Sequence, residues 1–295
     1  MKCIIPKSSG FCFGVKSAVD AAYEHIDSDT YMYGEVVHNP VVINELTAKG
    51  MSLIDSLDDI PKADSATVLV RAHGVPESVI LDISRRGFAL LDKTCPAVKK
   101  VHEIVRSASE KGLKTIIVGM PDHPEVIGIL GWSGSNVMVV RDLDEAKSML
   151  ARHGVPAEGV CMVAETTHNK KKYYEIYEYC KSVLPAIEFY DTICDETAIR
   201  QREVRELAKI SDCYIVVGGK HSSNVTKLYE IASEYCSNTQ HIESADELDI
   251  SKLSAIQTVV VVGGASTPDK SVYGVVKLIE EYCDEMRQPL EVDRL

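Results

Sequence analysis

A unit that recurs along the chain constrains the fold more than any other feature: a short apolar run, a turn rich in Gly, His or Ser, and then a helical pattern. The clearest apolar runs are rich in β-branched residues, which favour strands, and they cover 67–70, 115–118, 214–217 and 258–262. Strands that are apolar throughout and alternate with helices indicate parallel sheets covered on both faces, with right-handed crossovers. The sequence therefore predicts the α/β class.

The turns after these strands are the expected place for function, because ligands in such sheets bind beyond the carboxyl ends of the strands. Small and polar residues follow each run, at 71–74, 119–124, 218–224 and 263–269. A Walker loop is excluded, since Lys220 is followed by His221, and no G-x-G-x-x-G is present. We therefore expect neither an ATP site nor a dinucleotide site.

Length and charge narrow the functional class. At 295 residues the chain has room for two or three domains. Its 44 Asp and Glu against 32 Lys and Arg give a net charge of −12, which repels polyanions at long range. The aliphatic run at 259–262 falls far short of the roughly 20 residues that span a bilayer, and 1–6 lacks the apolar core of a signal peptide. We expect a cytoplasmic monomer that binds neither nucleic acid nor a membrane.

The nine cysteines include no C-x-x-C pair, which argues against both a disulfide framework and a zinc ribbon. Six of them lie in apolar or helical stretches, where a free cysteine packs as a small hydrophobic residue: Cys3, Cys161, Cys180, Cys213, Cys236 and Cys283.

The other three cysteines, Cys12, Cys95 and Cys194, each stand at the start of a predicted helix and are separated by domain-sized intervals. A helix start favours the thiolate, which is the form that binds metal. One such cysteine could be incidental, but three in equivalent places suit an iron–sulfur cluster or zinc. A cubane cluster with three thiolates keeps one iron open, which implies chemistry on a substrate.

Polar side chains at the strand ends supply the ingredients of a phosphate or diphosphate site. They are three histidines and a group of hydroxyl and amide residues: His38, His73, His123, Ser222, Ser223, Asn224 and Ser266. Plain helix capping is the alternative for the serines.

Nine short motifs occur in one order along the chain: 10–15, 35–39, 72–75, 94–96, 123–126, 166–167, 192–194, 222–224 and 264–266. In this order they resemble the 4-hydroxy-3-methylbut-2-enyl diphosphate reductase (LytB/IspH) family, from about residue 3 to about residue 283. The resemblance implies a trefoil of three similar α/β domains, with small and mostly parallel sheets, around a central iron–sulfur cluster. The domains would cover 13–95, 96–190 and 191–283 with 1–12, followed by a tail at 284–295.

The activity that the resemblance implies is the reductive removal of the allylic hydroxyl of 4-hydroxy-3-methylbut-2-enyl diphosphate. The products would be isopentenyl and dimethylallyl diphosphate, in the last step of the non-mevalonate isoprenoid pathway. The cofactor would be a 4Fe–4S cluster with three cysteine ligands and one open iron that binds the substrate oxygen. Reduced ferredoxin or flavodoxin would be the electron donor.

Site residues follow from the matching motifs. Cys12, Cys95 and Cys194 would be the cluster ligands, Glu125 the proton source, and Thr166 the threonine near both the substrate hydroxyl and Glu125. The substrate would be bound by His38, His73, His123, Thr166, Ser222, Ser223, Asn224 and Ser266. No role transfers to His168 or His221.

Two other functional classes stay open. A non-catalytic iron–sulfur sensor of oxygen or redox state would have no need of Glu125. A zinc-dependent hydrolase with Cys and His ligands would use Glu125 as its base and would be colourless and stable in air.

Overall fold

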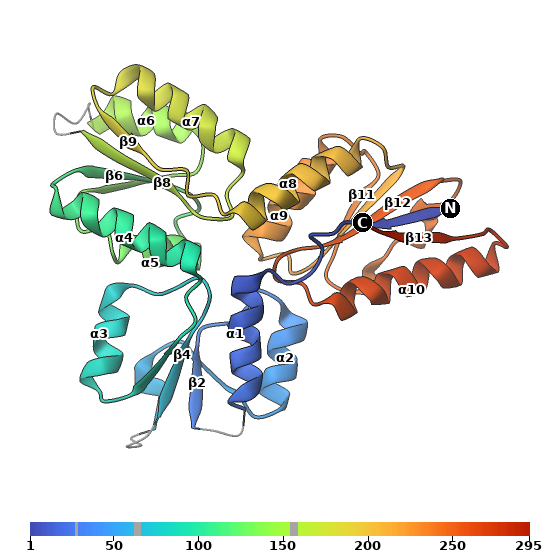
Figure 1. Cartoon of the computed structure of the whole chain (residues 1–295), viewed down its shortest axis with the longest axis horizontal. Helices are drawn as coiled ribbons and strands as arrows, with labels where there is room; N and C mark the ends of the chain where they lie inside the picture. Colours follow the sequence, from blue (N-terminus) through green and yellow to red (C-terminus); the bar gives the residue numbers. More distant parts are fainter. Residues whose placement is uncertain (27–28, 62–65, 154–158) are drawn as a thin grey trace. The chain divides into compact units, whose positions relative to one another are not determined.

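The computed structural model describes residues 1–26, 29–61, 66–153 and 159–295. The chain divides into two compact units. The first consists of Met1–Lys16, Val37–Asn44 and Asp195–Leu295, and the second of Ser17–Val36 and Glu45–Cys194. Two helices, α1 (Phe13–Glu24) and α2 (Pro40–Ala48), begin in the first unit and end in the second (Figure 1).

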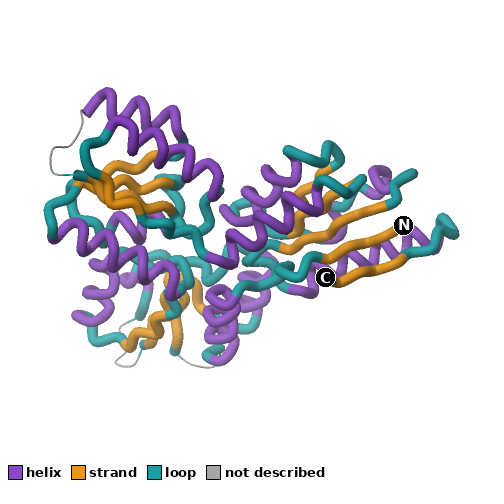
Figure 2. The backbone as a smooth tube through the Cα atoms, turned by 45° about the horizontal axis from the view of Figure 1, so that its top comes forward, coloured by secondary structure: helices purple, strands orange, loops and turns teal. Residues whose placement is uncertain are grey.

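The first unit contains one five-stranded sheet in the order β11-β10-β12-β1-β13, and every pairing in it is parallel. Its strands are β1 (Lys2–Ile5), β10 (Cys213–Val217), β11 (Thr239–Ile242), β12 (Thr258–Gly263) and β13 (Glu291–Arg294). Its helices are α8 (Asp195–Ala208), α9 (Ser223–Ser233) and α10 (Asp269–Glu285). Both chain termini lie at this sheet (Figure 2).

Successive side chains of β10 point to opposite faces of the sheet and are all apolar or aromatic, which explains why helices cover both faces. Ile215 and Val217 pack in one core with Val275 of α10, whereas Tyr214 and Val216 pack in the opposite core with residues of α8 and α9. In Figure 1 α10 lies on one side of the sheet and α8 and α9 on the other. A strand that is apolar at every position needs such a double cover.

The second unit contains two four-stranded parallel sheets, in the orders β3-β2-β4-β5 and β7-β6-β8-β9. The first has β2 (Thr30–Tyr33), β3 (Ser52–Ile54), β4 (Thr67–Val70) and β5 (Ala89–Asp92), with helix α3 (Glu77–Arg85). The second has β6 (Lys114–Val118), β7 (Val137–Val140), β8 (Val160–Ala164) and β9 (Ile187–Phe189). Its helices are α4 (Pro96–Glu110), α5 (Pro124–Leu130), α6 (Leu143–His153) and α7 (Lys170–Val183).

The sheet β7-β6-β8-β9 repeats the double cover. Met162 of β8 packs in one core with Tyr173 of α7, and Val163 packs in the opposite core with Val105 of α4 and Val126 of α5. The polar ends of β6 and β8 are thereby held next to the starts of helices, where the site residues lie.

The predicted α/β class with small parallel sheets is confirmed, and the four predicted strands are β4, β6, β10 and β12. Strand β13 was not predicted: it lies in the segment expected to be a tail and pairs with β1. The three-domain boundaries remain a prediction. In the part of the chain that the structure describes, no helix is both long and apolar enough to cross a membrane.

Two fully buried tyrosines provide a test of the packing. The Tyr173 hydroxyl donates to the Tyr190 carbonyl at 2.8 Å, whereas the Tyr214 hydroxyl has no hydrogen-bond partner among the described residues. Tyr173→Phe should lower the free energy of unfolding by about 1–2 kcal/mol, because the carbonyls of Tyr190 and Met162, which the hydroxyl contacts at 2.8 and 3.2 Å, lose this donor. Tyr214→Phe should leave it unchanged or raise it by up to about 1 kcal/mol, because an unpaired hydroxyl is removed. Urea unfolding would measure both, and equal losses would contradict the assignment.

Candidate functional site

The nine cysteines separate into two groups by exposure. Six are buried, and the three partly exposed ones are Cys12, Cys95 and Cys194. Burial raises the pKa of the Cys3 and Cys161 thiols to about 12. Buried thiols of this kind stay protonated and inert at neutral pH.

Each partly exposed cysteine stands at the start of a helix, as expected from the sequence. Cys12 directly precedes α1, Cys95 is the N-cap of α4 with Pro96 as the first helical residue, and Cys194 directly precedes α8. The exposed backbone N–H groups and the dipole at a helix start stabilise a thiolate. These are therefore the three thiols of the chain best suited to bind a metal.

The first unit carries Cys12 together with these residues of the predicted diphosphate site: His38, Ser222, Ser223, Asn224 and Ser266. The Cys12 N–H donates to the Ala265 carbonyl at 3.2 Å. One residue further on, the Ser266 hydroxyl donates to that of Ser222 at 3.0 Å, and the Ser266 carbonyl accepts from Asn39 Nδ2 at 3.0 Å. The turns after β10 and β12 and the 38–39 segment thus meet at one end of the sheet.

Close backbone packing brings His38 to the same turns. A Cβ atom on Gly219 would lie only 2.6 Å from the His38 carbonyl oxygen, so only glycine permits this approach. The segment that carries His38 therefore lies against the turn after β10.

The side-chain amide of Asn224 uses only one of its two polar atoms in hydrogen bonds to the described residues. Its Oδ1 accepts from the Ala265 N–H at 2.8 Å, but its buried Nδ2 has no partner among the described residues. Ser222 does cap α9, since its hydroxyl accepts from the Val225 N–H at 3.5 Å. Helix capping thus accounts in part for Ser222 but leaves the Asn224 amide available to an anion.

The second unit carries the other predicted residues: Cys95, Cys194, His73, His123, Glu125 and Thr166. His73 and His123 contact each other edge to face, with ring centroids 5.6 Å apart. His73 is also near Cys95 along the backbone, because the Cys95 N–H donates to the carbonyl of Ala72 at 3.0 Å. The structure therefore brings His73 and His123 together from two different sheets of this unit, and it brings the Cys95 backbone next to the residue before His73.

The Glu125 carboxyl is almost fully buried and bonded through both oxygens to one residue. Oε1 accepts from the Thr166 N–H at 2.6 Å, and Oε2 accepts from the Thr166 hydroxyl at 3.0 Å. The Thr166 carbonyl in turn accepts from the Cys194 N–H at 3.1 Å. A buried carboxyl, a hydroxyl and a thiol-bearing residue thus form one connected chain.

Sequence reasoning missed Glu165, and it left His168 without a role. Both side chains are buried here, and Glu165 is completely excluded from solvent. Glu165 directly follows β8, so it carried the same strand-end signal that pointed to Thr166. His221, at the turn after β10, is exposed.

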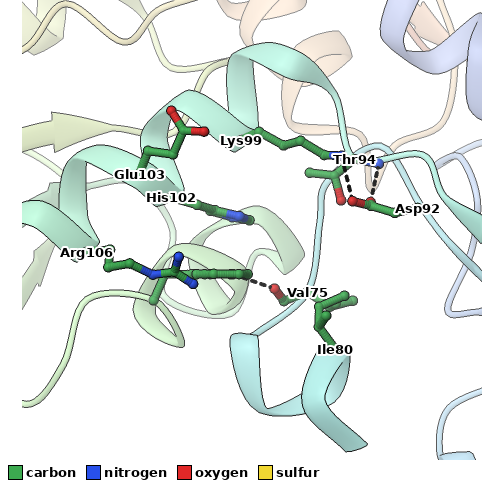
Figure 3. Close-up of a pocket in the computed structure, with 9 residues that line it drawn as sticks. Val75, Ile80, Asp92, Thr94, Lys99, His102, Glu103 and Arg106 are labelled. Carbon is green, nitrogen blue, oxygen red and sulfur yellow. Dashed lines mark hydrogen bonds and ion pairs between the residues drawn. The ribbon is translucent and has the colours of Figure 1, made fainter. Parts of the chain in front are cut away.

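A cavity of about 200 Å³ lies beside the turn that leads to Cys95 (Figure 3). The Asp92 carboxylate accepts from the Thr94 N–H at 2.9 Å and pairs with Lys99 at 2.6 Å. Burial alone would raise the pKa of Asp92, but the hydrogen bonds from Lys99 and Thr94 outweigh it and leave this pKa below its usual value. An ionised Asp92 therefore ties the turn before Cys95 to the first turn of α4.

The other side of this cavity is aromatic. His102 stacks on Trp132 with ring centroids 5.1 Å apart, and the Trp132 indole N–H donates to the Val75 carbonyl at 2.9 Å. Burial lowers the pKa of His102 to about 4, so its ring is neutral at pH 7. Two cationic side chains of this cavity are paired, Lys99 with Asp92 and Arg106 with Glu77.

The similarity of this chain to known proteins extends over nearly its whole length. The family model described as "LytB protein" matches residues 3–280. The 4-hydroxy-3-methylbut-2-enyl diphosphate reductase of Thermoanaerobacter sp. strain X514 is 40% identical over 285 residues, which is 95% of this chain and 96% of that protein. The protein of the same name from Clostridioides difficile strain 630 is 37% identical over 279 residues, or 94% of this chain and 98% of that protein.

Solved structures agree with these sequence matches. E-1-hydroxy-2-methyl-but-2-enyl-4-diphosphate reductase from Plasmodium falciparum has a TM-score of 0.91 at 24% identity, over 99% of this chain and 92% of that one, and so shows the same fold. A second structure, described as (E)-4-hydroxy-3-methyl-but-2-enyl diphosphate reductase, the terminal enzyme of the non-mevalonate pathway, has a TM-score of 0.67 at 34% identity. It matches 95% of this chain and 99% of its own. The chain therefore belongs to the LytB protein family.

Proposed function

We propose that this protein reduces 4-hydroxy-3-methylbut-2-enyl diphosphate to isopentenyl and dimethylallyl diphosphate, the last step of the non-mevalonate isoprenoid pathway. The connected chain from the Glu125 carboxyl through Thr166 to the Cys194 backbone carries the proposal. A buried carboxyl that could carry a proton is in this way linked to a candidate metal ligand, which supports the proposal. The relatives at 37–40% identity bear the name of this reductase.

Cys12, Cys95 and Cys194 are the proposed ligands of a 4Fe–4S cluster with one open iron. The donor set fits, because they are the only partly exposed cysteines of the chain and each stands at a helix start. When bound, the cluster would supply electrons and a Lewis acid. Zinc is the weaker alternative, since the overall change consumes two electrons.

The substrate diphosphate would be held by short-range donors despite the net charge of −12. The free Asn224 amide, the start of α9, the hydroxyls of Ser222, Ser223 and Ser266, and the imidazoles of His38, His73 and His123 are the proposed donors. Preorganised donors in a site that excludes water outweigh charges that are distant and screened.

Glu125 would carry the proton that turns the leaving hydroxyl into water. Its burial excludes competing water, and the Thr166 hydroxyl at 3.0 Å keeps the carboxyl oriented. Breaking an allylic C–O bond in this way takes two electrons and two protons, and it needs a general acid at the departing oxygen. The sensor alternative has no such need, and the relatives named above give it no support.

A reduced ferredoxin or flavodoxin is the proposed electron donor, and the protein is proposed to act as a cytoplasmic monomer. These proposals rest on the family resemblance and on the acidic composition.

The ligand assignment predicts the metal content of cysteine variants. Anaerobically purified protein should be brown, and Cys12→Ser, Cys95→Ser or Cys194→Ser should each lose most of its iron and sulfide, because a site with three thiolates has no spare ligand. Cys161→Ser and Cys213→Ser, which change buried thiols, should keep the full content. A full cluster in any of the first three variants would overturn the assignment, and zinc in place of iron would favour a hydrolase.

Diphosphate binding should depend on the Asn224 amide. Asn224→Ala should weaken the binding of dimethylallyl diphosphate by about 1–3 kcal/mol, because a charge-assisted hydrogen bond is lost. Asn224→Asp keeps the shape and the bond from Ala265 but presents an anion, so it should lose more. Calorimetry at constant cluster content would measure both, and unchanged affinity in both variants would place the anion elsewhere.

Glu125→Gln tests the proton carrier, since glutamine preserves size and hydrogen bonding but cannot donate an acidic proton. Turnover with an artificial reductant should fall by roughly 10²-fold or more, the usual scale for loss of a general acid. Iron content and substrate affinity should persist. Near-normal turnover would remove Glu125 from the mechanism.

A further inference from the structure

Thr192 lies two residues before Cys194 and has no part in the proposed mechanism, although its side chain is buried. Its hydroxyl forms two hydrogen bonds to one residue, Ala164, which is the last residue of β8. It accepts from the Ala164 N–H at 2.8 Å and donates to the Ala164 carbonyl at 2.7 Å. A single side-chain hydroxyl thus bonds both backbone groups at the end of this strand.

These two bonds take the place of a backbone ladder. Strands β8 and β9 pair in parallel, and the Tyr190 N–H continues the ladder by donating to the Met162 carbonyl at 3.0 Å. In a regular parallel ladder the next bond would run from the Ala164 N–H to the Tyr190 carbonyl. That carbonyl instead accepts from the Tyr173 hydroxyl at 2.8 Å, and Ala164 is bonded by the Thr192 side chain. The segment after β9 therefore leaves the sheet but stays attached to β8 through a side chain.

The Tyr173 hydroxyl also lies near that of Thr192, and it acts as a donor. Burial raises the pKa of Tyr173 well above its usual value, so the hydroxyl keeps its proton at neutral pH. Its contacts with the carbonyls of Tyr190 and Met162, at 2.8 and 3.2 Å, use that proton. The Thr192 proton is thereby left for the carbonyl of Ala164, a residue that is completely excluded from solvent.

Two residues further along both segments, a second bond joins the proposed metal ligand to the proposed proton carrier. The Cys194 N–H donates to the Thr166 carbonyl at 3.1 Å, and both carboxyl oxygens of Glu125 accept from Thr166. Thr192 and Cys194 are thus bonded in step to Ala164 and Thr166. Because unpaired backbone groups are costly in a buried place, the Thr192 bonds stabilise this register.

We infer that Thr192 is a positioning residue whose hydroxyl fixes the Cys194 segment against the end of β8 and so aligns the Cys194 thiol with the Glu125 carboxyl. It acts through Cys194 and Thr166. The consequence for turnover rests on the proposed function and deepens it, whereas the placement of Cys194 can be measured without any assumption about the reaction.

Thiol labelling of the full chain before cluster assembly tests the placement directly. Thr192→Val keeps the shape of the side chain but leaves the Ala164 N–H and carbonyl without this partner. Cys194 should then react with iodoacetamide about threefold faster or more, because loss of buried hydrogen bonds promotes local opening. The rates at Cys12 and Cys95 should change by less than about 1.5-fold, since their helix starts keep their own bonds. Peptide mass spectrometry would measure all three rates, and an unchanged rate at Cys194 or an equal rise at all three would overturn the inference.

A double-mutant cycle on the cluster-containing protein tests the alignment with Glu125. Thr192→Val should lower kcat by about tenfold or more while KM changes by less than about threefold, because it misaligns the reacting groups and leaves the diphosphate donors in place. In a Glu125→Gln background the same substitution should lower kcat by less than about twofold, because the coupled partner is absent. Equal losses in the two backgrounds would contradict an action through Glu125.

Matched variants separate the hydroxyl from the packing of the side chain. Thr192→Ser keeps the hydroxyl and should retain the labelling rate and kcat within about threefold. Thr115→Val makes the valine substitution in β6 of the same sheet, where the buried hydroxyl has no hydrogen-bond partner among the described residues, and should alter neither readout.

The serine variant also decides the matter if Thr192→Val does not fold. A loss of about tenfold or more in kcat for Thr192→Ser, at normal iron content, would assign the effect to the methyl group and overturn the inference. A wild-type protein that holds a cluster but does not reduce the substrate would instead overturn the proposed function, and the labelling rates would still judge the placement of Cys194.

Discussion

The central strands of this protein are apolar on both faces, and the rest of the structure follows from that constraint. Tyr214 and Val216 need one layer of helices while Ile215 and Val217 need another, so the strand offers little room for polar side chains. Most of them lie where the strands end and the helices begin. The proposed site residues accordingly gather at the strand ends, and the starts of the covering helices supply backbone N–H groups at the same positions.

This constraint is also why much of the site could be predicted from the sequence. Strand ends are visible as the point where a β-branched run gives way to Gly, His or Ser, so Cys95, His123 and Asn224 could each be placed at such a point. The exposure of the three helix-start cysteines, against six buried ones, follows from the same division between apolar strands and polar turns.

Two features could not be predicted, for different physical reasons. The segment Glu291–Arg294 is polar and largely exposed, and its pairing with β1 depends on backbone groups that every residue carries. Glu165 stood at a strand end, yet its environment depends on the space left by Gly119 and on the imidazole of His123, which both belong to the turn after β6, and on His168 of its own turn. Such an environment is a property of two segments together, and no local pattern records it.

The order of strands in the first unit has a consequence for synthesis of the chain on the ribosome. β1 is made first, but its neighbours in the sheet, β12 and β13, come from the last part of the chain. The second unit, which is nearly all formed by 17–194, has its strand partners much earlier. The nascent chain must therefore hold an unpaired apolar strand until β12 and β13 have been made, a period in which exposed strand edges favour aggregation and chaperone binding.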